Sequence, residues 1–304
     1  RLLEGRLDEA IPFSVSGADF SLSAEPVFAA PWRFASADIS GNLQLTARKV
    51  AFDRIALSSG GLDVDGAGEL WLAPDESGAE RLAARFEAVA SGRADKDTIL
   101  AFWPVDLGAD GREWVETNIH AGQVTSAEFV MDWPPGANDQ GFLPNEHLTL
   151  DFDVEGATVQ ILEDVPPARN VVASGHMEGN SLTVDVASGD FSAWEIDTAE
   201  VLLPRFHPKG ADMRVLASGR GPLQDLMRVL DESELNIGEV YGLNVDAMSG
   251  EGGLEIEFFR PMLTEVPEED LRYNITGGFQ GAAAPDIVRE FGLTESNVRV
   301  EVTE

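Results

Sequence analysis

Residues 91–135 read SGRADKDTILAFWPVDLGADGREWVETNIHAGQVTSAEFVMDWPP and interrupt a chain that otherwise alternates apolar and polar residues. Apolar side chains recur at helical spacing from Ile99 to Trp103, and Pro104 ends this first helix. A second short helix is predicted from about residue 109 to 119, after which alternation returns. A pair of helices between long runs of strand can cap the end of a sheet, so this stretch is expected to organise the fold.

The same layout recurs about 127 residues later in the chain. Residues 218–220 repeat the Ser-Gly-Arg of residues 91–93, and Gly250 matches Gly122 within one residue. A shared period across different side chains indicates one structural unit used twice, although common Gly and Leu residues could also produce such a match by coincidence. Two inserted helical elements are therefore predicted, near residues 97–119 and 222–243.

The rest of the chain reads as β-strands whose two faces differ chemically. Between residues 62 and 72, Leu62, Val64, Leu70 and Leu72 lie on one face, together with Gly66 and Gly68, and Asp63, Asp65 and Glu69 lie on the other. Residues 148–155 and 254–257 alternate in the same way. Short connections without a βαβ rhythm favour antiparallel pairing. The predicted fold is mainly β: a long, curved antiparallel sheet forming a groove, of the repeating β-groove or β-taco kind.

Three regions are expected along the chain. Residues 1–90 form a β-strand region, residues 91–217 a first helix-containing β repeat, and residues 218–304 a second, truncated one; the three can also form one continuous domain. The chain starts at Arg1 and ends inside the strand-like run 298–302, so we expect it to be a piece of a longer protein.

Composition excludes some classes of function. The 304 residues include 21 Lys and Arg against 54 Asp and Glu, a formal charge of −33, which disfavours binding of nucleic acid or simple electrostatic docking on an anionic membrane. There is no cysteine, as expected for an exported protein without disulfides, although a cytosolic protein can also lack them. No stretch is apolar over the length that spans a bilayer.

Motifs for catalysis or metal binding are absent from the sequence, so we do not expect an enzyme. The four histidines are isolated, and no phosphate loop, nucleophile elbow or HExxH motif is present. Asp63 and Asp65 fit strand alternation better than a calcium site. We interpret Trp103 and Trp114 as core anchors of the helical element, with a lid over the mouth of a groove as the alternative.

An apolar sheet face must be covered by a second sheet, by helices or by a ligand. Unpaired carboxylates are costly to bury, so the acidic residues are expected to face solvent. The acidic residues with this prediction are Asp151, Asp153, Glu155, Glu255 and Glu257.

Several segments resemble the AsmA-like proteins, most closely the YhdP type, whose relatives include TamB. The resemblance is specific over about residues 91–263 and generic elsewhere. The segments that carry it are AFWP at 101–104, WV at 114–115, GQVTSA at 122–127, the Ser-Gly turn and strands of 172–186, and 221–261 beginning GPL.

This resemblance implies a periplasmic segment of a protein that is anchored in the inner membrane by an N-terminal helix absent here. It further implies that phospholipid travels between the inner and outer membranes along an apolar groove, with no cofactor and no catalytic residues; partner proteins remain unknown. The groove is then expected to be lined by Leu62, Val64, Leu70, Leu148, Leu150, Phe152, Val154, Leu182, Val184, Leu254, Ile256 and Phe258.

Two alternatives stay open. A periplasmic scaffold or outer-membrane biogenesis factor with the same fold would have a closed β core and no bound lipid. An enzyme of carbohydrate or lipid chemistry would need a pocket with converging polar groups, and no motif supports it.

Overall fold

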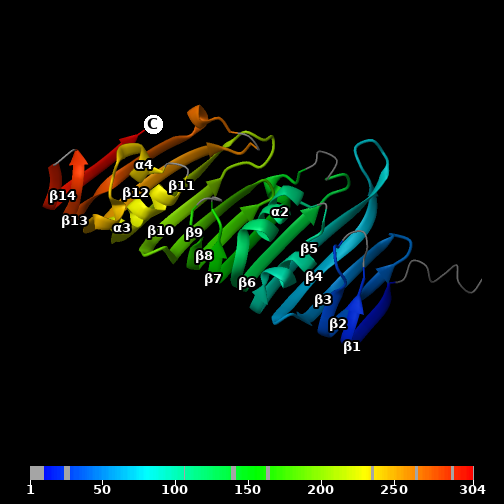
Figure 1. Cartoon of the computed structure of the whole chain (residues 1–304). Coiled ribbons are helices and arrows are strands. Elements are labelled where there is room, and N and C mark those ends of the chain that lie inside the picture. Colours follow the sequence, from blue (N-terminus) through cyan, green and yellow to red (C-terminus); the bar gives the residue numbers. More distant parts are fainter. Residues whose placement is uncertain are drawn as a thin grey trace, which may run out of the picture. The chain divides into compact units, whose positions relative to one another are not determined.

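The computed structural model describes residues 10–23, 28–105, 107–137, 142–161, 165–233, 236–263, 266–288 and 291–303. Fourteen strands form one sheet in which each strand lies beside its neighbours in the sequence (Figure 1). The strand pairs run antiparallel, for example β4 with β5 and β11 with β12. The predicted fold class, a mainly β protein built on an antiparallel sheet with two small helical insertions, is confirmed.

The strands are β1 Ile11–Leu22, β2 Trp32–Gln44, β3 Lys49–Ser59, β4 Leu62–Pro74, β5 Glu80–Asp95, β6 Ile119–Trp133, β7 Leu148–Val159, β8 Ala168–Glu178, β9 Ser181–Phe191, β10 Trp194–Leu203, β11 Asp212–Pro222, β12 Ser249–Pro261, β13 Arg272–Val288 and β14 Phe291–Thr303. The helices are α1 Lys96–Phe102, α2 Ala109–Asn118, α3 Leu223–Glu232 and α4 Ile237–Tyr241, with 3₁₀ turns η1 Asn145–His147, η2 Val245–Ala247 and η3 Glu268–Asp270.

The chain divides into two compact units. Unit 1 comprises residues 1–117, 123–154 and 175–181, and unit 2 comprises residues 118–122, 155–174 and 182–304. One helical pair, α1 and α2, belongs to unit 1, apart from the last residue of α2, and the other pair, α3 and α4, belongs to unit 2. Each unit therefore contains strands and a helical insertion.

The first helical element begins at a side-chain cap. The carboxylate of Asp95 accepts a hydrogen bond from the backbone N–H of Thr98 at 2.9 Å, which satisfies a free donor in the first turn of α1. α1 ends before Pro104, as the sequence indicates. Trp103 is half-buried, and its indole N–H donates to the carbonyl of Leu107 at 2.6 Å.

The interpretation of Trp114 as a core anchor is wrong. Its side chain is 49% exposed, and α2 has no buried residue at all. The helical spacing of Trp114 is real, but α2 is too short and too polar to present an apolar face to the sheet. Helical periodicity alone does not show which face a marginal helix buries.

The two helical insertions share a backbone geometry on their C-terminal sides. Gly122 and Gly250 have φ values of +134° and +132°, which other residues rarely adopt. A Cβ atom at either position would lie 2.9 Å from the Cα of an alanine on a neighbouring strand, Ala157 for Gly122 and Ala282 for Gly250. The match supports the internal repeat predicted from the sequence.

Glycines on the apolar face make room for aromatic rings. A Cβ at Gly68 would meet the ring of Phe86 at 2.3 Å, which explains the glycine that alternation places on that face. Similar ring contacts recur along the sheet. These pairs are Gly175 with Phe152, Gly221 with Trp194 and Gly252 with Phe279.

Candidate functional site: the apolar face of the sheet

In unit 1 the strand register collects apolar side chains on one face. Directly paired residues of antiparallel strands share a face. Leu70 of β4 pairs with Val50 of β3 and with Ala84 of β5, and Ala84 pairs in turn with Trp133 of β6. We call this surface the apolar face of unit 1. Its members on β3 to β6 are Val50, Phe52, Ile55, Leu57, Leu62, Val64, Leu70, Leu72, Leu82, Ala84, Phe86, Ala88, Ala90, Ala127, Phe129, Met131 and Trp133.

Aromatic rings form a row across this face. The ring centroids of Phe13 and Phe52 are 5.9 Å apart, and those of Phe52 and Phe86 are 6.0 Å apart. Phe86 pairs with Met131 of β6, which continues the row. Rings at these separations attract one another and present a continuous apolar surface.

Strand β7 contributes four of the predicted lining residues to the same face, the first of them the buried Leu148. Its acidic residue Asp153 accepts a hydrogen bond from the hydroxyl of Ser126 at 2.5 Å, and Ser126 pairs with Ser91 on the polar face. Alternation then places Phe152 on the apolar face. Leu150, Phe152 and Val154 are half-buried, whereas the acidic residues between them are exposed.

Unit 2 repeats the pattern with longer aliphatic rows. Val184 of β9 pairs with Val201 of β10, which pairs with Val215 of β11, and Phe258 of β12 and Tyr273 of β13 continue the row. We call this surface the apolar face of unit 2. A second row along it consists of Val186, Ala199, Ala217, Ile256, Ile275 and Val302.

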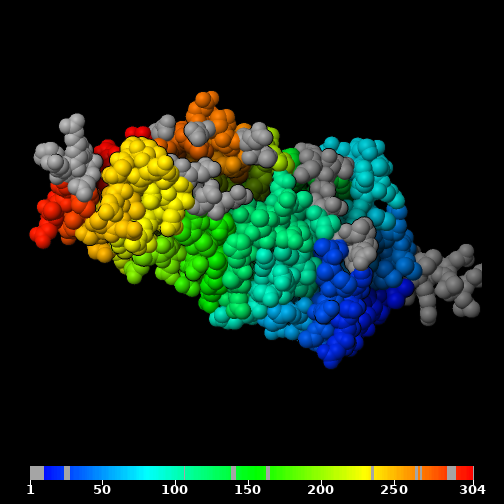
Figure 2. Space-filling model, in the orientation of Figure 1, coloured from blue at the N-terminus to red at the C-terminus, as the bar shows by residue number. Residues whose placement is uncertain are grey.

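Helix α3 covers one end of this face. Leu223 and Leu226 of α3 pack against a buried cluster of Trp194, Leu254, Phe279 and Ala282. The indole N–H of Trp194 donates to the carbonyl of Pro222 at 3.1 Å, which ties the ring to the start of the helix. In the space-filling view, the yellow residues of α3 and α4 form a continuous block (Figure 2). At the opposite ends of β12 and β13, the described residues of the connection include the 3₁₀ turn η3 but no α-helix.

Helix α1 plays the same part in unit 1. The indole N–H of Trp32 donates to the carbonyl of Ala101 at 2.7 Å, and the ring of Phe102 lies 5.1 Å from that of Trp32. Near this contact Leu62 is only 6% exposed. At the far ends of β4 and β5 on the same face, Leu72 is 40% and Leu82 57% exposed. The face is thus closed at one end of its strands and accessible at the other.

The predicted lining residues lie on these two faces, but they are not equally accessible. Leu62, Leu148 and Leu254 are buried at 6%, 6% and 8% exposure, so they support the surface rather than present it. The other nine are half-buried. All fourteen strands belong to one sheet, so the described residues supply no second sheet to cover the faces.

Sequence reasoning missed some of the larger members of the two faces. The sequence of β5 does not alternate clearly between apolar and polar residues, because it contains several alanines and Val89. The face that Phe86 occupies therefore follows only from its pairing with Gly68 and Met131. The same holds in unit 2, where the bulge in β10 shifts the register. The residues missed are Phe52, Phe86, Phe129, Met131, Trp133, Val201, Val215, Tyr273 and Ile275.

The opposite face is polar and carries cross-strand ion pairs. Arg220 donates to Glu195 at 2.6 Å, and its hydrogen bond with this carboxylate, together with the charges of Asp197 and Glu195, raises the pKa of Arg220. Arg214 pairs with Glu257 at 2.9 Å. Of the five carboxylates predicted to face solvent, Asp151, Asp153, Glu155 and Glu255 are exposed and Glu257 is half-buried.

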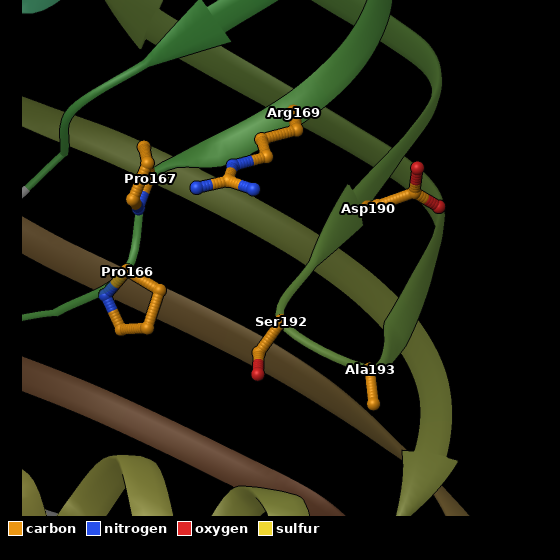
Figure 3. Close-up of a pocket in the computed structure, with 6 residues that line it drawn as sticks. All are labelled: Pro166, Pro167, Arg169, Asp190, Ser192 and Ala193. Atoms are coloured by element: carbon orange, nitrogen blue, oxygen red, sulfur yellow. The ribbon is translucent and has the colours of Figure 1, made fainter.

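A shallow pocket lies outside both apolar faces (Figure 3). It is lined by Pro166, Pro167, Arg169, Asp190, Ser192 and Ala193. The carboxylate of Asp190 accepts a hydrogen bond from Asn170 at 2.6 Å, and Ser192 donates to Asp225 at 2.9 Å, so these polar groups already hold protein partners. No cluster of His, Asp and Glu that could hold a metal ion occurs in the described part of the chain.

No helix among the described residues combines the length and apolarity needed to cross a membrane. Neither the curated proteins nor the solved structures include a match to this chain. The family model described as YhdP protein matches residues 3–276. That span takes in β1 to β5 as well as the region where the sequence resemblance was specific. With this match over most of its length, and an antiparallel sheet that separates an apolar from an acidic face, the chain belongs to the YhdP family.

Proposed function

We propose that this chain is a periplasmic segment of a lipid-transfer protein, and that phospholipid acyl chains move along the apolar faces of its sheet between the inner and outer membranes. The observation that carries the proposal is the accessible apolar surface of each unit. Large apolar side chains such as Phe152 and Phe258 lie on these faces and are only half-buried. Membership of the YhdP family supports the same function.

The physical argument is that acyl chains are recognised by area rather than by directed bonds. Each methylene removed from water contributes about 0.8 kcal/mol, so a broad apolar surface holds a lipid without a specific polar motif. It also permits movement over the face, because one methylene contact resembles the next.

Native mass spectrometry of the purified chain tests the proposal. We expect co-purified or reloaded phospholipid on the wild type and much less on Phe152→Asp and Ile256→Asp, because each introduces a carboxylate on an apolar face. The melting temperature of every variant is measured in parallel. Lipid loss that only follows the loss of folded protein, or a wild type that retains no lipid, would contradict the proposal and favour a scaffold with a closed core.

A further inference from the structure

We propose that Arg260 contacts the phosphate group of a phospholipid whose acyl chains lie on the apolar face of unit 2. The inference rests on the proposed function and adds a headgroup contact to it. Arg260 pairs with Met213 of β11 in an unbroken register. It therefore lies on the same face as Phe258 and Ile256, as a cation at the edge of an apolar surface.

The position of Arg260 along β12 fits the length of a lipid. Leu254 lies under α3 at the closed end of the face, and Arg260 is six residues further along the strand, about 20 Å away at the usual rise per residue. This distance is comparable to an extended acyl chain. A lipid with its chain ends near Leu254 would place its headgroup beside Arg260.

Arg260 also differs from its neighbouring arginines in its partners. Arg214 and Arg272, on the polar face, pair with Glu257 and Asp212, and both guanidinium groups lie over the ring of Phe259. Arg260 has no ion pair within the described residues. Its Nη2 atom lies 3.5 Å from the carbonyl oxygen of Leu263, a long contact for a hydrogen bond.

Within the described residues this half-buried cation has no counter-charge, which is a costly arrangement in a chain whose formal charge is −33. A phosphodiester supplies a charge of the required sign. The planar guanidinium matches two phosphate oxygens with parallel, charge-assisted hydrogen bonds. Such a contact also gives an anionic lipid one favourable site on an otherwise acidic protein.

Retention of two lipids with the same acyl chains tests the inference. The chain is stripped of lipid, loaded with phosphatidylglycerol or with diacylglycerol, and analysed by native mass spectrometry, for the wild type, Arg260→Met and the polar-face control Arg214→Met. We expect Arg260→Met to weaken retention of phosphatidylglycerol by about tenfold and to leave diacylglycerol unchanged. Arg214→Met should leave the retention of both lipids unchanged. Melting temperatures should confirm that all three proteins are folded.

Equal weakening of both lipids by Arg260→Met, or no weakening of either, would overturn the headgroup contact. A wild type that retains diacylglycerol as tightly as phosphatidylglycerol would overturn it too, while sparing the proposed function. A wild type that retains neither lipid would overturn both. Excess inorganic phosphate should not displace phosphatidylglycerol, and displacement would show a site for the free ion instead.

Discussion

Phe258 and Phe259 are adjacent in β12 and point to opposite faces, which makes them a matched pair for testing the apolar face. Phe258 pairs with Val215 and Tyr273 in the apolar row of unit 2. Phe259 lies on the polar face under the guanidinium groups of Arg214 and Arg272, at 5.9 and 4.9 Å from its ring centroid. Both phenylalanines are half-buried, so replacement by Asp is the same chemical change in a similar degree of burial.

The expected effect of Phe258→Asp follows from the methylenes that it displaces. A hydrated carboxylate that keeps three methylenes off the face costs about 2.4 kcal/mol of lipid binding, at about 0.8 kcal/mol for each methylene. With about 1.4 kcal/mol for each factor of ten, lipid retention should weaken by about fifty-fold. Phe259→Asp removes two cation–π contacts of the order of 0.5–1 kcal/mol each and should leave retention unchanged.

The assay is phospholipid retention by native mass spectrometry together with thermal unfolding of each variant. We expect the two variants to lose similar folding stability, because each loses a half-buried ring, and to differ only in lipid. Equal lipid retention by Phe258→Asp and Phe259→Asp would refute the assignment of the apolar face as the lipid surface. So would a stronger loss in Phe259→Asp.

Three further predictions concern stability, each measured by thermal or denaturant unfolding. Gly122→Ala and Gly250→Ala should each cost about 1–3 kcal/mol, because the left-handed backbone and the 2.9 Å approach to a neighbouring strand leave no room for a Cβ, whereas Gly111→Ala in α2 should be neutral or stabilising. Phe279→Ala should cost about 3–5 kcal/mol, since Phe279 is 2% exposed in the core cluster of unit 2; a loss under 1 kcal/mol would contradict that packing. Hydrogen bonds from Ser77, Arg81 and the Ala79 backbone lower the pKa of Asp75 to about 2, so the stability lost in Asp75→Asn should be full above about pH 4 and vanish as the pH falls through about 2.

Much of the fold could be predicted because the sequence alternates with few exceptions. Alternation placed Leu62, Val64, Leu70 and Leu72 on one face, and the structure shows them on the same face. The helical insertions were predictable from a change of period and a proline after Trp103. Trp114 was mispredicted because periodicity indicates a helix but not what the helix packs against.

The candidate site was harder to predict than the fold, because a face is defined by pairing between strands. Alternation alone cannot assign Phe86, whose neighbours Ala84 and Ala88 are small and whose polar-face neighbour Val89 is apolar. The degree to which each side chain of the face is buried could not be predicted from the sequence either. Leu254 and Phe258 share a strand and a face, yet only Leu254 lies in the cluster beneath α3. Such differences in burial depend on which part of the face an inserted helix packs against.

The helical insertions give the apolar faces a direction. β5 leads into α1 and β11 leads into α3, and in each unit the strand-to-helix junction lies at the end where the face is buried, near Leu62 and Leu254. Since the layout repeats within the chain, closure of one end belongs to the repeating unit rather than to one local contact. On the proposed function, a lipid on such a face would have an apolar barrier beyond its chain ends, and its polar group would lie towards the end away from the helix. Arg260 lies at that end of unit 2 and has no ion pair within the described residues, so one feature of the fold would account for both the orientation of the lipid and the position of this cation.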